Sequence, residues 1–184
     1  MHLKLKRKGK IFLISDEHYY HSNIIKYDNR PFKDVVEMRE IMIAKHNAIV
    51  TPEDTTFHLG DFCMSKDPEN AKRIIERLNG NHYFIKGSHD EWLPPEHPER
   101  YMFSYNSYFI VLDHYQMDHW PRSHHGSLHF FGHQHGRSKS ENIKGNKMEV
   151  FCGDFDYAPV ELDVLIKKII NKPDYFKGIN FSKQ

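Results

Sequence analysis

The feature that most constrains this chain is a series of short apolar runs, the first five of which are each followed within two residues by an acidic residue or a histidine. The runs are rich in β-branched and aromatic residues, which is typical of strands, several of them buried on both faces. We therefore predict strands over six runs, at residues 11–15, 55–60, 82–87, 108–113, 128–132 and 148–153.

Helix signals stand between and after these runs. A capping aspartate opens a segment at residue 34 and another at residue 67, where a proline follows it, and the segment 161–171 predicts a last helix. A hairpin is predicted around Asn106–Ser107. Strands and helices alternate in the first half and strands crowd the second. This order indicates a layered α/β domain with helices outside a central sheet or pair of sheets.

Composition limits the remaining classes of protein. A chain of 184 residues with 39% hydrophobic content predicts one domain over residues 1–184. Its net charge of +1 argues against a chain built mainly to bind a nucleic-acid backbone or an anionic membrane, although the run KLKRKGK is basic. Cys63 and Cys152 are too isolated for a disulfide framework or a thiolate zinc site. With no apolar span of about 18 residues, we expect a cytoplasmic protein without membrane contact.

The residues that follow the strands share one chemistry, since they are almost all carboxylates and imidazoles. The carboxyl ends of parallel strands lie on one edge of a sheet, so these side chains should converge there. Residues two apart in extended backbone point to the same side, which applies to Asp16 with His18 and to His133 with His135. The full set also contains Asp61, Ser88, His89, Asp90 and His114.

Such a group of acids and imidazoles needs a cation to hold it together. Like charges packed within a few ångströms would raise the carboxylate pKa values and destabilise the fold. Mixed imidazole and carboxylate donors without thiolate suit Mn, Fe, Zn, Ni or Co. Five or six donors exceed one tetrahedral site, so we predict two divalent ions, about 3.5–4 Å apart, that share a carboxylate.

The motifs at the strand ends resemble, in order, the five motifs of the calcineurin-like metallophosphoesterase superfamily. The resemblance spans about residues 11–160. The segments DEHYYHSNI, DNRPF and SHHGSLHFFGHQHG further resemble its small, capless bacterial and phage members. The fold that it implies is a four-layer α/β sandwich of two β-sheets flanked by helices. The motifs are Asp16-x-His18, Gly60-Asp61, Gly87-x-His89-Asp90, His114 and Gly132-His133-x-His135.

The resemblance also implies how the donors divide. One ion would be held by Asp16, His18, Asp61 and His135, and the second by Asp61, His114, His133 and the residue at position 88. The family normally has asparagine where this chain has Ser88. A serine hydroxyl is a shorter and weaker donor, so we expect reduced or altered occupancy of the second site rather than its loss.

The chemistry that the resemblance implies is hydrolysis of phosphate esters. His89 has no ligand role, so it is the candidate general acid, with Asp90 beside it to orient the imidazole. His21, Asn23, Arg30 and His125 are candidate substrate contacts, and Arg30 can bind phosphate through its fork. The remaining histidines in helical or strand patterns are expected to be structural. These are His46, His58, His82, His97 and His129.

We predict a metal-dependent phosphoesterase. The favoured interpretation is a phosphodiesterase that acts on a small nucleotide-like or cyclic phosphate. A phosphomonoesterase or a nuclease could use the same site, although the near-neutral charge counts against nucleic acid. A non-catalytic metal-binding scaffold with a degraded second site is the alternative from another class, favoured by Ser88. His119 competes with His114 as the ligand, and His114 is preferred because it directly follows a strand.

Overall fold

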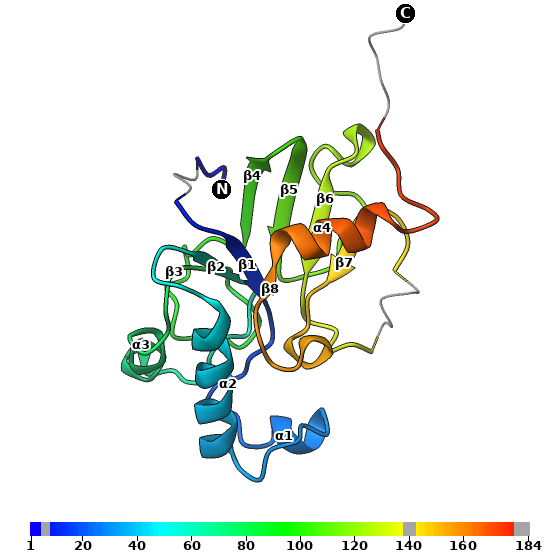
Figure 1. The fold of residues 1–184 in the computed structure, drawn as a ribbon. Coiled ribbons are helices and arrows are strands. Elements are labelled where there is room, and N and C mark those ends of the chain that lie inside the picture. The colour runs from blue at the N-terminus through cyan, green and yellow to red at the C-terminus, as the bar shows by residue number, and fades with distance from the viewer. Residues whose placement is uncertain (5–7, 138–142, 179–184) are drawn as a thin grey trace, which may run out of the picture.

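Two four-stranded β-sheets, flanked by helices, form the centre of the molecule (Figure 1). The computed structural model describes residues 1–4, 8–137 and 143–178. A continuous apolar core lies between the sheets, where Leu13 and Phe57 of one sheet share a cluster with Phe103, Leu112 and Phe130 of the other. The predicted fold class, an α/β arrangement of two sheets flanked by helices, is confirmed.

The first sheet has the strand order β3–β2–β1–β8. Its strands β1 (Ile11–Ile14), β2 (Thr55–His58) and β3 (Asn81–Phe84) are parallel, and the short β8 (Val160–Glu161) runs antiparallel to β1. The register pairs the last residue of each parallel strand with that of its neighbour, Ile14 with His58 and His58 with Phe84. The loops that leave these strands therefore start side by side.

The second sheet has the order β4–β5–β6–β7. Strands β4 (Arg100–Tyr105) and β5 (Tyr108–Asp113) form the predicted hairpin around Asn106–Ser107, and β6 (Leu128–Phe131) and β7 (Lys147–Glu149) continue it in parallel. The prediction of a strand over residues 148–153 is wrong after Glu149, where β7 ends. The backbone amide of Cys152 donates to the carbonyl of Ser15, and the chain then turns into the 3-10 helix η3 (Cys152–Phe155).

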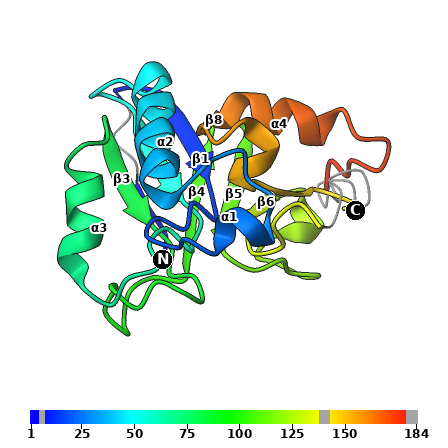
Figure 2. The ribbon, with the colours of Figure 1, turned by 90° about the horizontal axis from the view of Figure 1, so that it is seen from below.

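The helices begin where capping residues predict. Asp34 accepts hydrogen bonds from two backbone amides of α2 (Val35–Ile49), and Asp67 caps α3 (Pro68–Ile75). Helices α3 and α4 (Leu162–Ile170) lie on opposite sides of the molecule (Figure 2). The short helix α1 (Ile24–Tyr27) was not predicted.

A second apolar cluster lies between the first sheet and helices α2 and α3. It joins Ile14 and Phe62 to Met38, Met42 and Ile74. Burial of these side chains fixes the helices against the sheet whose strand ends carry the candidate site. In the described part of the chain, no helix has both the length and the apolar character that crossing a bilayer requires.

Candidate metal centre

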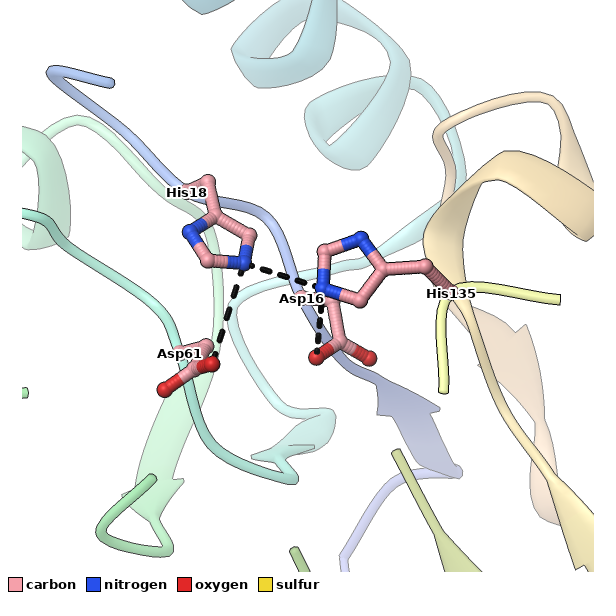
Figure 3. Close-up of side chains that lie close together, drawn as sticks. All are labelled: Asp16, His18, Asp61 and His135. Atoms are coloured by element: carbon pink, nitrogen blue, oxygen red, sulfur yellow. Dashed lines mark hydrogen bonds and ion pairs between the residues drawn. The ribbon is translucent and has the colours of Figure 1, made fainter. Parts of the chain in front are cut away.

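The carboxyl ends of strands from both sheets bring the predicted donors together. Asp16 and His18 follow β1, Asp61 follows β2, and His135 follows β6 in the second sheet (Figure 3). One donor atom from each of these four residues lies within 4.8 Å of the others. The predicted convergence is therefore observed, and it joins the edges of two sheets rather than one.

The backbone at these positions is not extended, so that part of the prediction is wrong. Asp16, His18, Asp61, His133 and His135 all have positive φ, between 52° and 76°. Non-glycine residues adopt this left-handed conformation at a cost of about 1–2 kcal/mol each. Strain of this kind clusters at functional sites, where the surrounding fold holds it. Here it turns side chains that leave different strands toward one centre.

Glycine allows the close approach of two of these loops. A Cβ atom on Gly132 would lie 2.6 Å from Ser15 Oγ and 2.7 Å from Asp16 Oδ2. A side chain at this position would therefore push the β6 loop, with His133 and His135, away from β1.

Four donors form the first cluster, Asp16, His18, Asp61 and His135, which lies largely beneath the surface. His135 Nε2 is 3.6 Å from Asp16 Oδ1, and His18 Nε2 is 3.7 Å from Asp61 Oδ2 (Figure 3). The two Nε2 atoms are 3.3 Å apart. Two carboxylate oxygens and two imidazole nitrogens that face one another this closely make a donor set suited to a divalent transition metal.

Asp61 also belongs to a second cluster, with His114 and His133. His114 Nδ1 is 2.8 Å from the carbonyl oxygen of Leu59. Because a carbonyl only accepts, Nδ1 keeps its proton, and Nε2 is the nitrogen that can give up a proton to bind a metal. That Nε2 is buried, faces Asp61 Oδ2 at 3.4 Å, and has no hydrogen-bond partner among the described residues. A buried nitrogen aimed at a carboxylate in this way fits a metal ligand.

Burial and charge set the protonation of these donors. Burial lowers the pKa of His18 to about 2, so this imidazole is neutral and able to bind a metal. The pKa of His114 is raised to about 9: burial alone would lower it, but the facing carboxylate of Asp61, 3.4 Å away, and the charge of Asp16 outweigh burial. The proton on His114 thus neutralises the carboxylates in the metal-free protein, a role that a divalent cation would take over.

Ser88 and His89 lie at the exposed side of the shared carboxylate. The Ser88 hydroxyl donates to Asp61 Oδ2 over 3.2 Å, and the backbone amide of His89 donates to Asp61 Oδ1 over 2.8 Å. The His89 ring lies 5.4 Å from the ring of His18 and borders a cavity of about 500 Å³ over the clusters. Ser88 is therefore next to the second cluster, and His89 faces the space that a substrate would enter.

Asp90 does not orient His89, so that prediction is wrong. Its buried carboxylate accepts hydrogen bonds from the backbone amides of Asp61, Cys63 and Gly87 and from the indole of Trp92. Asp90 thus ties the loop after β2 to the loop after β3. Its role is to position the backbone that presents Asp61 and His89.

The four candidate substrate contacts lie in different surroundings, and only one of them borders the cavity over the clusters. His21 borders the cavity, with its Nδ1 3.5 Å from His18 Nδ1. Asn23 is the exposed residue that precedes α1, outside the cavity lining. Arg30 is only 4% exposed, because its guanidinium donates to the carbonyls of Asp16 and Glu17, so a phosphate contact is wrong. His125, in the 3-10 helix η1 (Ser123–His125), borders a separate cavity, so a role at this site is also wrong.

Asp28 is the contact that sequence reasoning missed. Its Oδ2 lies 2.8 Å from His135 Nδ1 and 3.0 Å from Arg30 Nη2, and its side chain is 5% exposed. His135 donates through Nδ1 and so presents Nε2 to the first cluster, which is the arrangement that fixes histidine ligands in metal sites. Asp28 follows α1 rather than a strand, so the strand-end pattern contained no signal for it.

The histidines expected to be structural are hydrogen-bonded away from both clusters. His58 pairs with the buried Glu17 and with His82, and burial lowers the pKa of His58 to about 3. His46, His97 and His129 each lie within hydrogen-bond distance of a backbone carbonyl. The exposed His119 belongs to neither cluster, in agreement with the preference for His114.

A known protein resembles this chain over nearly its whole length. No protein-family model matches the chain. The uncharacterized protein MJ1445 of Methanocaldococcus jannaschii is 36% identical over 177 residues, which are 93% of this chain and 97% of that protein.

The chain also resembles solved structures, among them the following two. The protein of unknown function AQ665 from Aquifex aeolicus aligns with a TM-score of 0.65 and 23% identity over 87% of this chain and 99% of its own. A predicted phosphoesterase from Streptococcus pneumoniae aligns with a TM-score of 0.42 and 16% identity over 77% of this chain and 70% of its own. The likeness to AQ665 supports the fold.

Proposed function

This chain belongs to one family with the uncharacterized protein MJ1445 of M. jannaschii, and we propose that it acts as a metal-dependent phosphoesterase of the calcineurin-like type. The observation that carries the proposal is the carboxylate of Asp61, which is common to two donor clusters. One carboxylate between two sets of imidazole and carboxylate donors is the arrangement of a two-metal hydrolytic site.

The donors fit two divalent ions from the set Mn, Fe, Zn, Ni and Co. The sites contain nitrogen and oxygen donors without thiolate, since Cys63 and Cys152 belong to neither cluster. When bound, two such ions lower the pKa of a water molecule toward neutrality and stabilise the charge that builds on the phosphoryl oxygens.

His89 is the proton donor of the proposed reaction. In hydrolysis a water oxygen bonds to phosphorus, the ester P–O bond breaks, and the leaving oxygen takes up a proton. The exposed His89 borders the cavity, and its backbone amide is fixed on Asp61. This amide contact fixes the backbone of His89 beside the shared carboxylate, so its imidazole stays within reach of a phosphate bound there.

An open site favours small diesters. Ser88, His89 and His133 are exposed at the second cluster, so a substrate group on each side of the phosphate can extend into solvent. We infer a phosphodiesterase that acts on a small nucleotide-like or cyclic phosphate. A phosphomonoesterase and a metal-binding scaffold are distinct outcomes of the test.

The test compares an aryl diester with an aryl monoester. Chelator-treated protein is reloaded with Mn²⁺, its metal content is measured, and hydrolysis of bis(p-nitrophenyl) phosphate and p-nitrophenyl phosphate is followed. We expect faster hydrolysis of the diester, and a loss of about 10³-fold in kcat with both ions released in Asp61→Asn. Asp163→Asn on α4 is the matched control. Two bound ions without hydrolysis of either ester would contradict an enzyme.

A further inference from the structure

A row of three aromatic rings leads outward from the first cluster. The ring centroids of His18 and His21 are 5.4 Å apart, and those of His21 and Tyr27 are 6.0 Å apart. All three side chains border the cavity of about 500 Å³ above the clusters. The cavity wall on this side is therefore aromatic from the metal ligand His18 to the surface.

Tyr27 ends this row with its ring largely uncovered. It is 66% exposed, and its ring meets His21 edge-on, with an angle of 76° between the two planes. In a T-shaped contact one ring presents its edge to the other, so His21 covers at most one flat face of the tyrosine ring. A planar aromatic group entering the cavity can therefore lie on a face of Tyr27.

The short helix α1 holds Tyr27 in this place. The buried Ile24 anchors the first turn in the core, and the backbone amide of Tyr27 donates to the carbonyl of Asn23. Ile24 and Met64 also border the cavity and add apolar surface beside the ring. The wall next to Tyr27 thus suits an apolar, planar group rather than a second charged one.

Positive charge lies elsewhere on the rim of the same cavity. Arg137 borders it and is exposed, and no carboxylate of the described residues pairs with its guanidinium. The cavity therefore combines metal-binding carboxylates, an aromatic wall and an unpaired cation. Its volume falls within the range of about 300–1,000 Å³ that small-molecule sites occupy.

We propose that the cavity binds a nucleotide diester, with its nucleobase stacked on Tyr27 and its phosphate at the two clusters. This proposal rests on the proposed function, because it names the substrate class of that site. Stacking on an aromatic side chain tolerates any base, since every base has a flat π-face. The subsite should therefore select a nucleoside ester over a simple alkyl ester and discriminate little between bases.

The experiment uses two diesters that share a leaving group. Thymidine 5′-(p-nitrophenyl phosphate) and methyl p-nitrophenyl phosphate both release p-nitrophenol, so their kcat/KM values differ only through the other substituent. In the Mn²⁺-loaded protein we expect the thymidine ester to be favoured by about 5- to 100-fold. Tyr27→Ala should abolish this preference by lowering kcat/KM for the thymidine ester, whereas Tyr27→Phe should retain it. The control is Phe176→Ala, an exposed aromatic outside the cavity lining.

A binding measurement separates this proposal from the proposed function. Titration calorimetry with thymidine 5′-monophosphate reports the subsite in both metal-loaded and chelator-treated protein, and Tyr27→Ala should weaken binding by about 5- to 100-fold. If neither ester is hydrolysed and binding still depends on Tyr27, the phosphoesterase fails and the subsite stands. Equal hydrolysis of both esters by wild type and by Tyr27→Ala, with unchanged nucleotide binding, would overturn the subsite.

Discussion

The two donor clusters share Asp61 but differ in their surroundings. In the first cluster, Asp16 and His18 are buried, and the Nδ1 atom of His135 is hydrogen-bonded to the carboxylate of Asp28. In the second, His114 is buried but His133 lies at the surface and borders the same cavity as Ser88. A buried, hydrogen-bonded donor set is fixed before a metal arrives, whereas an exposed one must be ordered by it. We therefore expect a tight first ion and an exchangeable second ion.

Removing one imidazole from each cluster should have the largest effect and should split the two sites. His18→Ala should lose the first ion and lower kcat about 10²- to 10³-fold, because it removes a fixed donor. His133→Ala should keep one ion per chain and lose only the second. Metal content after dialysis, together with diester hydrolysis, checks this. Equal loss of both ions in the two variants would show that the clusters bind as one unit.

The carboxylate of Asp28 should affect the binding affinity of the first ion only. Asp28→Asn keeps the shape of the side chain but removes the charge that faces His135 and Arg30. We expect the first ion to bind about 10- to 100-fold more weakly, with the second unchanged. Competition with a chromogenic chelator measures both affinities, and Asp163→Asn on α4 is the matched control. An equal change at both sites would refute a selective role for Asp28.

The stability of the chelator-treated protein should depend on pH because His114, in the second cluster, loses a proton as the pH rises. The pKa of His114 is raised to about 9, so its contribution to the stability of chelator-treated protein is full below pH 6.5 and is lost as pH rises through 9. Metal affinity at the second site should rise over the same window, by at most about tenfold per pH unit, because the ion displaces one proton.

Urea unfolding at pH 6 and pH 9 in the presence of chelator measures this loss of stability. The loss should be absent in His114→Ala, which has no proton to release, and it should shrink when the metal is restored. A loss that persists unchanged in His114→Ala would assign it to another group.

The smallest effect is expected at Ser88. Its hydroxyl now donates to Asp61, whereas the amide oxygen of an asparagine would add a donor beside the second cluster. Ser88→Asn should tighten the second ion by about 3- to 10-fold and leave the first unchanged. Calorimetric titration with Mn²⁺ checks this, and Ser88→Ala should show no tightening. An unchanged second affinity in Ser88→Asn would remove serine as the cause of the asymmetry.

Local patterns predicted the elements that carry the site. Apolar runs marked the strands, and capping aspartates marked helices such as α2, because these signals lie in consecutive residues. The short α1 escaped detection, since four residues give no helical period. The strand over residues 148–153 was cut short by a hydrogen bond from Cys152 to Ser15, a contact between distant segments.

The errors at the site have the same origin. Arg30 and Asp90 each carry a group suited to phosphate or proton chemistry, but both are buried and hydrogen-bonded to loops that are distant in sequence. Asp28 was overlooked because its partner, His135, is 107 positions away. The sequence gives the chemistry of each side chain. The direction in which a side chain points depends on neighbouring residues that folding brings into contact with it.

The sequence by itself determined which donors exist and that they leave the ends of strands. The motif resemblance implied how the donors are shared, and the tertiary structure supplies the physical cause of that sharing. His133 and His135 are two residues apart yet enter different clusters, because left-handed backbone angles turn them in different directions. Asp61 can serve both clusters because the edges of the two sheets meet at this point. Such angles and meetings are set by packing across the whole core, which no short stretch of sequence encodes.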